Sequence, residues 1–316
     1  MIKRNVSLKD FSNYKIGGNA AYFLNVATKE DLISGINEWR EIAKGLADDG
    51  KNIFILGGGT NILFSDDGFK GLVIKDSIDT VQLREDQVIC GAGMLLTKLL
   101  DFCIDNSLSG LEWAGGLPGT VGGAVRGNAG AFGGETKDNV LEVTSINLNT
   151  QQIISRDNAD CLFSYRNSIF KSEAKDEFIL SVTFQLQKGE KAKIENKTLE
   201  KANYRKTKHP LEYPNLGSVF KNVPFDNVPE AHRNELTQYI KNDPIPVMPT
   251  GKLIFLAGLK GKRVGDAIVS DKHTNFIVNL GSATAKDVND LIEIIKNEIK
   301  QKFGITLEEE IMRLDN

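Results

Sequence analysis

Hydrophobic and polar positions near the N-terminus predict a small strand–helix–strand domain. Residues 28–40 predict a helix, since Thr28 can accept a hydrogen bond at its start and apolar residues recur at helical spacing. This apolar stripe is formed by Leu32, Ile36 and Trp39. The apolar runs within residues 52–61 and 71–75 predict two buried strands. We expect these elements to form an α+β domain over residues 1–78.

Strand-like stretches recur between residues 80 and 205 and predict a second α+β domain. One apolar helix, residues 95–106, interrupts them. A charged segment then leads into turn residues, and Pro210 and Pro214 indicate a domain boundary there. We therefore expect a second domain over residues 79–208.

The remaining residues, 209–316, predict a third domain that ends in a long helix. Residues 224–250 are punctuated by proline and contain one possible helix, EAHRNELTQYI. Thr284 can cap the last helix and Gly304 can end it. Its apolar stripe consists of Val288, Leu291, Ile292, Ile295 and Ile299.

Composition narrows the class of protein. The net charge is −3 and the pI is about 5.8, which disfavours a nucleic-acid-binding protein. The three cysteines are widely spaced, match no metal-ligand pattern and are typical of a reducing cytoplasm. No stretch approaches the ~20 apolar residues of a membrane span. We expect a cytoplasmic protein with no metal site and no membrane insertion.

Two glycine-rich segments are the first candidates for chemistry. GGGTN follows a predicted strand, and consecutive glycines there can turn several N–H groups toward one anion. Its residues are Gly57, Gly58, Gly59, Thr60 and Asn61. A tight turn at the exit of the strand is the alternative reading. No GK[ST] follows, so this is no Walker loop.

The second segment is longer, and nine of the twenty residues from Gly115 to Gly134 are glycine. Glycine costs about 0.5–1 kcal/mol against alanine in regular structure, so positive φ angles or close ligand contact should compensate. Two such segments suit a dinucleotide better than a mononucleotide, although a loop packed on a neighbouring strand is the alternative. The candidate contacts are Pro118, Gly119, Thr120, Gly122, Gly123, Asn128 and Gly130.

Polar clusters supply candidate catalytic groups. SYRNS carries Tyr165 and Arg166, GSVFKN carries Ser218, and the chain ends in three glutamates before IMRL. A surface ion pair, a turn cap and an acidic tail are the structural alternatives for these three clusters. The three histidines have no metal-ligand spacing, and no Ser/His/Asp triad can be assembled.

Taken together, these segments resemble the UDP-N-acetylenolpyruvoylglucosamine reductase family, also called MurB. The matching pieces come in family order and span residues 13 to 311. They are NYKIGGNA, ILGGGTNILFSDDGFKGLVI, GLEWAGGLPGTVGGAVRGNAGAFGGE, SYRNSIF, EYPNLGSVFKN, AGLKGKRVGDAIVSDKHTNFIVN and GITLEEEI. The resemblance implies a three-domain α+β flavoprotein. Its first two domains would bind FAD in a vanillyl-alcohol-oxidase-type (PCMH-type) fold, and its smaller third domain would bind substrate.

The resemblance also implies roles for particular residues. Arg166 matches the active-site arginine, Ser218 the proton-donating serine and Glu310 the catalytic glutamate. Substrate contacts are expected from Tyr165, Lys221, Asn222 and His273. The chain departs from the family in having Glu309 where proline is usual and Phe255 where an acidic residue is common, and its residues 223–249 look longer than usual.

The implied reaction reduces UDP-N-acetylglucosamine enolpyruvate to UDP-N-acetylmuramate for peptidoglycan synthesis. NADPH would be the hydride donor, FAD would be held without a covalent bond, and no obligate protein partner is evident. Two alternatives stay open at this stage. One is a flavin oxidase of the same fold, many of which tether FAD through His or Cys. The other is a binding module without catalysis.

Overall fold

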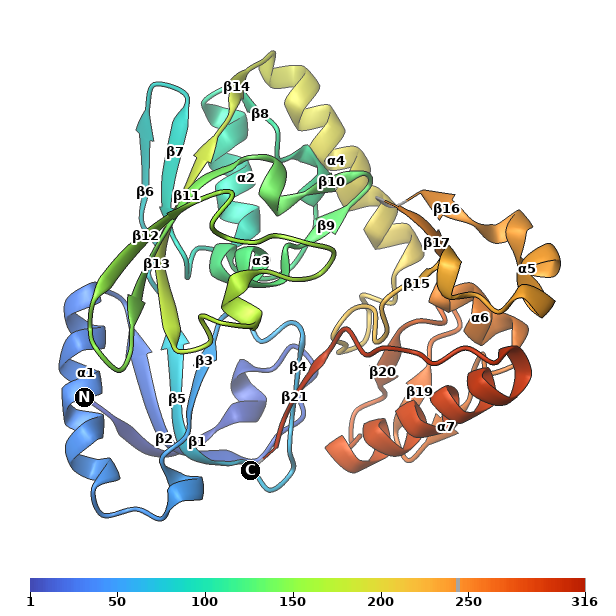
Figure 1. The fold of residues 1–316 in the computed structure, drawn as a ribbon, viewed down its shortest axis with the longest axis horizontal. Coiled ribbons are helices and arrows are strands. Elements are labelled where there is room, and N and C mark those ends of the chain that lie inside the picture. The colour runs from blue at the N-terminus through green and yellow to red at the C-terminus, as the bar shows by residue number, and fades with distance from the viewer. Residues whose placement is uncertain (243–244, 316) are drawn as a thin grey trace. The chain divides into compact units, whose positions relative to one another are not determined.

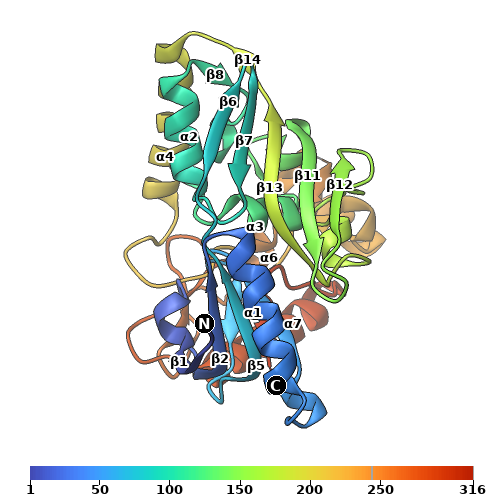
Figure 2. The same ribbon diagram turned by 90° about the vertical axis from the view of Figure 1, so that its left-hand side faces the viewer.

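The computed structural model describes residues 1–242 and 245–315, which divide into two compact units. Each unit collects three separated segments of the chain (Figures 1 and 2). Unit 1 consists of Met1–Val6, Ala20–Gly58 and Lys70–Tyr204. Unit 2 consists of Ser7–Asn19, Gly59–Phe69 and the chain from Arg205 onward. The three domains expected at 1–78, 79–208 and 209–316 stay a prediction.

The first layer of unit 1 is a four-stranded sheet covered by one long helix (Figure 1). The strand order is β1-β2-β5-β3, with β1 at Lys3–Ser7, β2 at Asn19–Val26, β5 at Phe69–Asp76 and β3 at Ile53–Leu56. Helix α1, Lys29–Ala43, buries its predicted stripe against the sheet, and Thr28 caps it in a capping box with Asp31. The helix and both strands predicted here are confirmed.

The second layer of unit 1 is a five-stranded antiparallel sheet, whose strands lie side by side in Figure 2. Its order is β12-β11-β13-β7-β6, with β12 at Ile153–Asp157, β11 at Val140–Asn147, β13 at Glu177–Gln185, β7 at Gln87–Gly91 and β6 at Val81–Arg84. Helix α2, Leu96–Asp105, packs in the same hydrophobic core. These elements confirm the predicted strands and the predicted helix.

Two helices of unit 1 differ from expectation. Part of the second glycine-rich segment, expected as a loop, is helix α3, Val121–Gly127, because the Thr120 side chain accepts a hydrogen bond from Gly123 N and caps it. The charged segment expected to lead into turns is helix α4, Lys191–Lys208. Its buried positions are Ile194, Thr198 and Arg205, and only the first is apolar, so the buried face shows no hydrophobic pattern in the sequence.

Unit 2 is built around the C-terminal helix α7, Ala285–Phe303. Thr284 caps this helix and Gly304 ends it with a positive φ, both as predicted. Unit 2 also contains three small sheets, with strand orders β18-β19-β20, β15-β17-β16 and β21-β4, and the first of them contacts α7. Their strands are β18 Arg263–Val264, β19 Ala267–Val269, β20 Ile277–Asn279, β15 Val223–Pro224, β17 Pro246–Met248, β16 Lys241–Asn242, β21 Met312–Leu314 and β4 Ile62–Phe64.

Short elements complete the two units. The proline-punctuated segment of unit 2 contains α5, Glu230–Leu236, where a helix was considered possible, and α6 follows at Thr250–Leu256. Unit 1 adds the short strands β8 Leu108–Ser109, β9 Gly130–Ala131, β10 Gly134–Glu135 and β14 Gln187–Lys188. Single 3₁₀ turns lie at Leu8–Phe11, Asp48–Gly50, Glu112–Ala114, Thr136–Asp138, Ile169–Lys171, Phe225–Asn227 and Thr237–Tyr239.

Candidate active site

The residues singled out from the sequence fall into both units. Unit 1 contains Gly57, Gly58, Pro118, Gly119, Thr120, Gly122, Gly123, Asn128, Gly130, Tyr165 and Arg166. Unit 2 contains Gly59, Thr60, Asn61, Ser218, Lys221, Asn222, His273 and Glu310. Each set is described below within its own unit.

The two glycine-rich segments meet in unit 1, where the exit of β3 touches the entry of α3. A Cβ atom on Gly58 would lie 3.0 Å from Gly119 Cα, and one on Gly57 would lie 2.7 Å from Thr120 Oγ1. These contacts leave no room for side chains, so close packing of protein on protein accounts for both glycines. The same holds for Gly122, whose Cβ would lie 2.9 Å from Ala92 Cβ.

Two other glycines in α3 have no such explanation. A Cβ atom on Gly127 would meet nothing within 4 Å, and one on Gly123 would touch only Thr120 Oγ1, at 3.4 Å. Glycine inside a helix costs about 1 kcal/mol relative to alanine. A bare backbone here therefore fits a surface on which a ligand packs closely.

Arg126, also in α3, was not singled out from the sequence. Its guanidinium is half-buried and has no hydrogen bond or ion pair within the described part of the chain, and burial lowers its pKa. Arg126 is three and four residues after Gly123 and Gly122 and therefore lies on the same side of α3. An isolated charge within an apolar, glycine-rich stretch was the signal that could have identified it.

Arg166 lies in a strained turn of unit 1. Ser164 and Asn167 exchange both backbone hydrogen bonds, at 3.1 Å each, which places Arg166 third in a four-residue turn. Its φ is +55°, a conformation that glycine usually supplies and that is enriched in functional residues. Its guanidinium donates to Gly130 O at 2.9 Å and lies 5.1 Å from the ring centroid of Tyr165.

Asn128 joins this turn to the glycine-rich segment. Its side chain is fully buried, donates to Ser164 O at 3.0 Å and accepts from Lys137 N at 3.1 Å. A Cβ atom on Gly130 would lie 2.8 Å from Glu135 Cγ, so this position also requires glycine. The segment therefore supports Arg166 as well as the helix.

In unit 2, Ser218 follows a glycine with a φ of +81°, Gly217. The Ser218 side chain is half-buried, and its hydroxyl has no hydrogen-bond partner among residues 1–242 and 245–315. The next residues run beside the C-terminal segment, since Glu310 N donates to Val219 O at 2.8 Å and Lys221 N donates to Glu308 O at 2.9 Å. Unit 2 thus brings the predicted serine and the predicted glutamate to adjacent segments.

The three consecutive glutamates have different surroundings. Glu308 is exposed and pairs with Lys221. Burial favours the neutral form of Glu309, but ion pairs with Arg313 at 2.6 Å and Lys296 at 2.5 Å outweigh it and hold the pKa of Glu309 below its ordinary value. Glu310 is half-buried, and Asn61 Nδ2 donates to its backbone oxygen at 2.9 Å.

Three other predicted residues, Asn222, His273 and Gly59, also belong to unit 2. Asn222 Oδ1 accepts from Thr250 N at 3.2 Å and so fixes the start of α6. His273 is largely buried, burial lowers its pKa, and its Nδ1 accepts from Asn275 N at 3.3 Å. Its neutral ring therefore presents Nε2 as the donor nitrogen. At Gly59, φ is +65° and any Cβ would overlap Phe11 O, which explains this glycine without a ligand.

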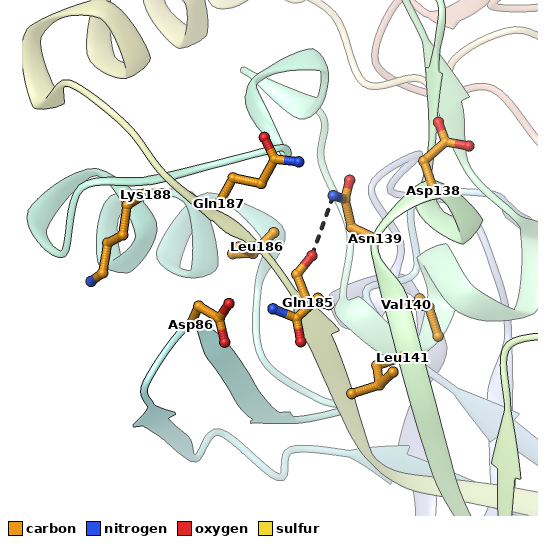
Figure 3. Close-up of a pocket in the computed structure, with 9 residues that line it drawn as sticks. All are labelled: Asp86, Asp138, Asn139, Val140, Leu141, Gln185, Leu186, Gln187 and Lys188. Carbon is orange, nitrogen blue, oxygen red and sulfur yellow. Dashed lines mark hydrogen bonds between the residues drawn. The ribbon is translucent and has the colours of Figure 1, made fainter.

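A pocket of about 550 Å³ lies elsewhere in unit 1, where β11 begins and β13 ends (Figure 3). Asp86, Asp138 and Lys188 line it together with the end of β13, and Asn139 Nδ2 donates to Gln185 O at 3.5 Å. None of the predicted site residues belongs to it.

Among the described residues, no group of His, Cys, Asp and Glu side chains could hold a metal ion, and no helix has the length and apolar character that a membrane span needs.

The chain is similar to known proteins over nearly its whole length. Residues 209–314 match the C-terminal domain model of UDP-N-acetylenolpyruvoylglucosamine reductase, and residues 33–154 match an FAD binding domain. The chain is 37% identical to the UDP-N-acetylenolpyruvoylglucosamine reductase of Clostridium novyi (strain NT), over 98% of this chain and 91% of that protein. The chain belongs to the UDP-N-acetylenolpyruvoylglucosamine reductase family.

Two further relatives support the assignment. The enzyme of that name from Lachnoclostridium phytofermentans is 38% identical over 97% of this chain and 91% of its own length. The crystal structure of the family member from Thermus caldophilus covers all of both chains with a TM-score of 0.77 and 29% identity. The predicted family, the α+β class and the FAD-binding fold are confirmed.

The bare backbone in α3 fits the FAD of this family. A Cβ atom on Gly127 would meet nothing and one on Gly123 would touch only Thr120 Oγ1, and the same helix carries Arg126, a positive charge without a partner in the described part of the chain. A cofactor with a diphosphate and a flat ring system suits such a surface, because it needs both close backbone approach and charge compensation.

Proposed function

We propose that the protein reduces UDP-N-acetylglucosamine enolpyruvate to UDP-N-acetylmuramate in the cytoplasm, with NADPH as hydride donor and non-covalent FAD. Bound FAD would supply the hydride-transfer chemistry between NADPH and C3 of the enolpyruvyl group. The observation that carries the proposal is the placement of Ser218. Its hydroxyl lacks a described partner and lies on a segment paired with that of Glu310, in a chain that matches the named reductases almost end to end.

The backbone at Gly57, Gly58 and Gly119 and the open surface at Gly123 and Gly127 would hold the cofactor. Arg126 would compensate negative charge there. The three cysteines are buried and free, in keeping with a reducing compartment.

Arg166 would meet the charge that develops on the substrate. Addition of hydride at C3 places an electron pair on C2, and that pair spreads into the adjoining carboxylate. Fixed donors aimed at developing charge are usually the largest catalytic contribution, and losing one typically costs about 10²–10³ in rate. The hydrogen bond to Gly130 O and the constrained turn hold this guanidinium in place before the reaction.

Ser218 would donate the proton to C2. Its O–H bond breaks as the C2–H bond forms from the enolate electron pair, and the serine oxygen then takes a proton from solvent. A hydroxyl is a weak acid, but the carbanion is strongly basic, so placement matters more than pKa. The absence of a described competing hydrogen bond leaves this hydroxyl available for the task.

Glu310 is the best of the three candidates for the catalytic glutamate. Glu309 is held ionised by two cations, and Glu308 is exposed and paired with Lys221. Glu310 is half-buried beside the Ser218 segment, and in the neutral form it would donate a hydrogen bond to the enolate carboxylate.

We assign Tyr165, Lys221, Asn222 and His273 to substrate contacts. Lys221 pairs with Glu308, so substrate phosphate would replace that carboxylate as its partner. His273 would donate from Nε2, because its Nδ1 already accepts from Asn275 N.

Anaerobic stopped-flow absorbance tests the proposal. We expect NADPH to bleach the flavin absorbance and UDP-N-acetylglucosamine enolpyruvate to restore it. Bleaching without restoration by this substrate, together with rapid restoration by oxygen, would favour the flavin oxidase instead. A flavin that stays with the protein after acid precipitation would likewise contradict the non-covalent assignment.

A further inference from the structure

Ser218 lies on a bulge between two paired segments of unit 2. The chain from Pro214 runs antiparallel to β20, with a bridge between Asn215 and Val278 and a hydrogen bond from Val219 N to Asn275 O at 2.8 Å. Between these pairings, three residues of one segment, 216–218, face two of the other, Phe276 and Ile277. One extra residue bends a strand and re-aims a side chain, a device found next to active sites.

Asn275 holds the downstream end of this bulge. Its Oδ1 accepts from Phe220 N at 3.1 Å, and its Nδ2 donates to Phe220 O at 2.8 Å. The side-chain amide therefore pairs with both the backbone N–H and the backbone C=O of one residue, as a neighbouring strand would. Asn275 is 3% exposed and Phe220 is 1% exposed, so water cannot replace either bond.

Asn215 holds the upstream end. Its Oδ1 accepts from Gly217 N at 3.0 Å, and its Nδ2 donates to Tyr213 O at 2.8 Å. Its backbone oxygen accepts from Asn13 Nδ2 at 2.7 Å. At 5% exposure, Asn215 is also buried. Both ends of the bulge are thus pinned by buried amides, while the Ser218 hydroxyl between them makes no described hydrogen bond.

The other edge of the same segment carries the catalytic carboxylate. Phe220 bridges Glu309, and Glu310 N donates to Val219 O at 2.8 Å. Val219 and Phe220 therefore form hydrogen bonds with Asn275 on one side and pair with the segment of Glu309 and Glu310 on the other. Moving this pair of residues would move Ser218 and Glu310 together.

We propose that Asn275 and Asn215 are positioning residues that fix the Ser218 hydroxyl for proton transfer to C2. This inference rests on the proposed function, because it assigns a purpose to Ser218 in that reaction. Neither asparagine touches the substrate in this scheme. Both act through the backbone on either side of the serine, and Asn275 also acts on the segment that carries Glu310.

The consequence is chemical as well as kinetic. Protonation makes C2 a stereocentre, and a hydroxyl held on one side delivers its proton to one face only. A displaced hydroxyl lets water compete from either face. Misplacement by about 1 Å can cost about 10²-fold in rate.

The test compares flavin reduction by NADPH with reoxidation by the enolpyruvyl substrate in the holoenzyme. For Asn275→Ala we expect unchanged reduction, unchanged substrate affinity, about 10²-fold slower reoxidation and product with both C2 configurations. Asn275→Asp keeps the shape, and its protonated form restores both bonds to Phe220. Its reoxidation rate should therefore recover toward that of the wild type as the pH is lowered.

The matched control is Asn279→Ala. Asn279 is equally buried in unit 2, but its side chain bonds to Tyr14 O, Gly281 N and Ala283 N instead. We expect it to lose thermal stability yet keep reoxidation and a single C2 configuration. Should Asn275→Ala fail to fold, Asn275→Asp and Asn215→Ala give the same comparison.

Two outcomes would overturn the inference. One is wild-type reoxidation with a single C2 configuration in the Asn275 and Asn215 variants. The other is an equal defect in Asn279→Ala. Failure of the proposed function is distinguishable, since wild-type protein would then not be reoxidised by the substrate at all.

Discussion

At the residue scale, side chains that are adjacent in the sequence have different surroundings in the fold. Glu309 and Glu310 are adjacent and chemically identical, yet Glu309 is tied to Arg313 and Lys296. The backbone around Ser218 includes Gly217 with its positive φ and is bonded by the side chains of Asn215 and Asn275.

The glutamates can be separated by substitution. Glu310→Gln should slow flavin reoxidation by about 10²–10³-fold, because it removes a charge-stabilising acid, with little change in stability. Glu309→Gln should lower the melting temperature by breaking its two ion pairs, with a smaller kinetic defect. Paired half-reaction kinetics and thermal unfolding would distinguish them. A loss of under about tenfold in Glu310→Gln would remove Glu310 from the chemistry.

His209 makes stability depend on pH. Burial lowers the pKa of His209 to about 4, and the charges of His273, Arg205 and Lys272 add to the effect. The unfolded chain takes up this proton near pH 6.5, so it binds more protons between those values. The free energy of unfolding should therefore fall as the pH falls from 6.5 toward 4.

Replacing this ring provides the check. His209→Phe keeps an aromatic ring beside Phe276 but removes the proton site, so urea unfolding should show a smaller loss of stability between about pH 7 and about pH 5. Some pH dependence should remain from His273, whose pKa is also lowered. Equal pH dependence in variant and wild type would contradict the assignment.

At the element scale, α1, α2 and α7 were predictable from their apolar stripes, whereas α3 and α4 were not. Thr28 and Thr284 cap the starts of α1 and α7, as the sequence predicts, and both helices bury their predicted apolar stripes. In α4 the buried positions of Thr198 and Arg205 hide the stripe. Helix α3 was not predicted because glycine has a low helix propensity. The helix forms because tertiary packing and the Thr120 cap stabilise it.

Helix α3 offers a direct test of the cofactor surface. Gly127→Ala should raise the melting temperature of the apoprotein, because alanine favours the helix by up to about 1 kcal/mol and its Cβ meets nothing. The same substitution should weaken FAD binding if the cofactor packs on that backbone. Calorimetry of apoprotein with added FAD measures both. Gly133→Ala is the control, since it also lies in open space but has a φ of +82° and should only destabilise.

Unchanged FAD affinity in Gly127→Ala would contradict the assignment of α3 to the cofactor surface. The glycines at positions 57, 58 and 122 are less informative, because their contacts within the protein already exclude side chains.

At the scale of the whole molecule, the two units are assembled from alternating segments. Residues 59–69 belong to unit 2, and β4 pairs with β21 so that Ile62 lies opposite Met312. No local pattern predicts a pairing across 250 positions. The family resemblance identified Arg166, Ser218 and Glu310 in the sequence, whereas the proposed role of Asn275 depends on its contacts with Phe220, 55 positions away. Motifs therefore indicated which residues to consider, and the fold indicates what holds them.

The central claim is that the Ser218 hydroxyl supplies the proton that completes reduction of the enolpyruvyl group. Single-turnover reoxidation of NADPH-reduced Ser218→Ala by UDP-N-acetylglucosamine enolpyruvate tests it most directly. We predict that bleaching by NADPH keeps its wild-type rate while reoxidation slows by about 10²–10⁴-fold, the usual contribution of a positioned proton donor. Reoxidation of this variant at the wild-type rate would contradict the account.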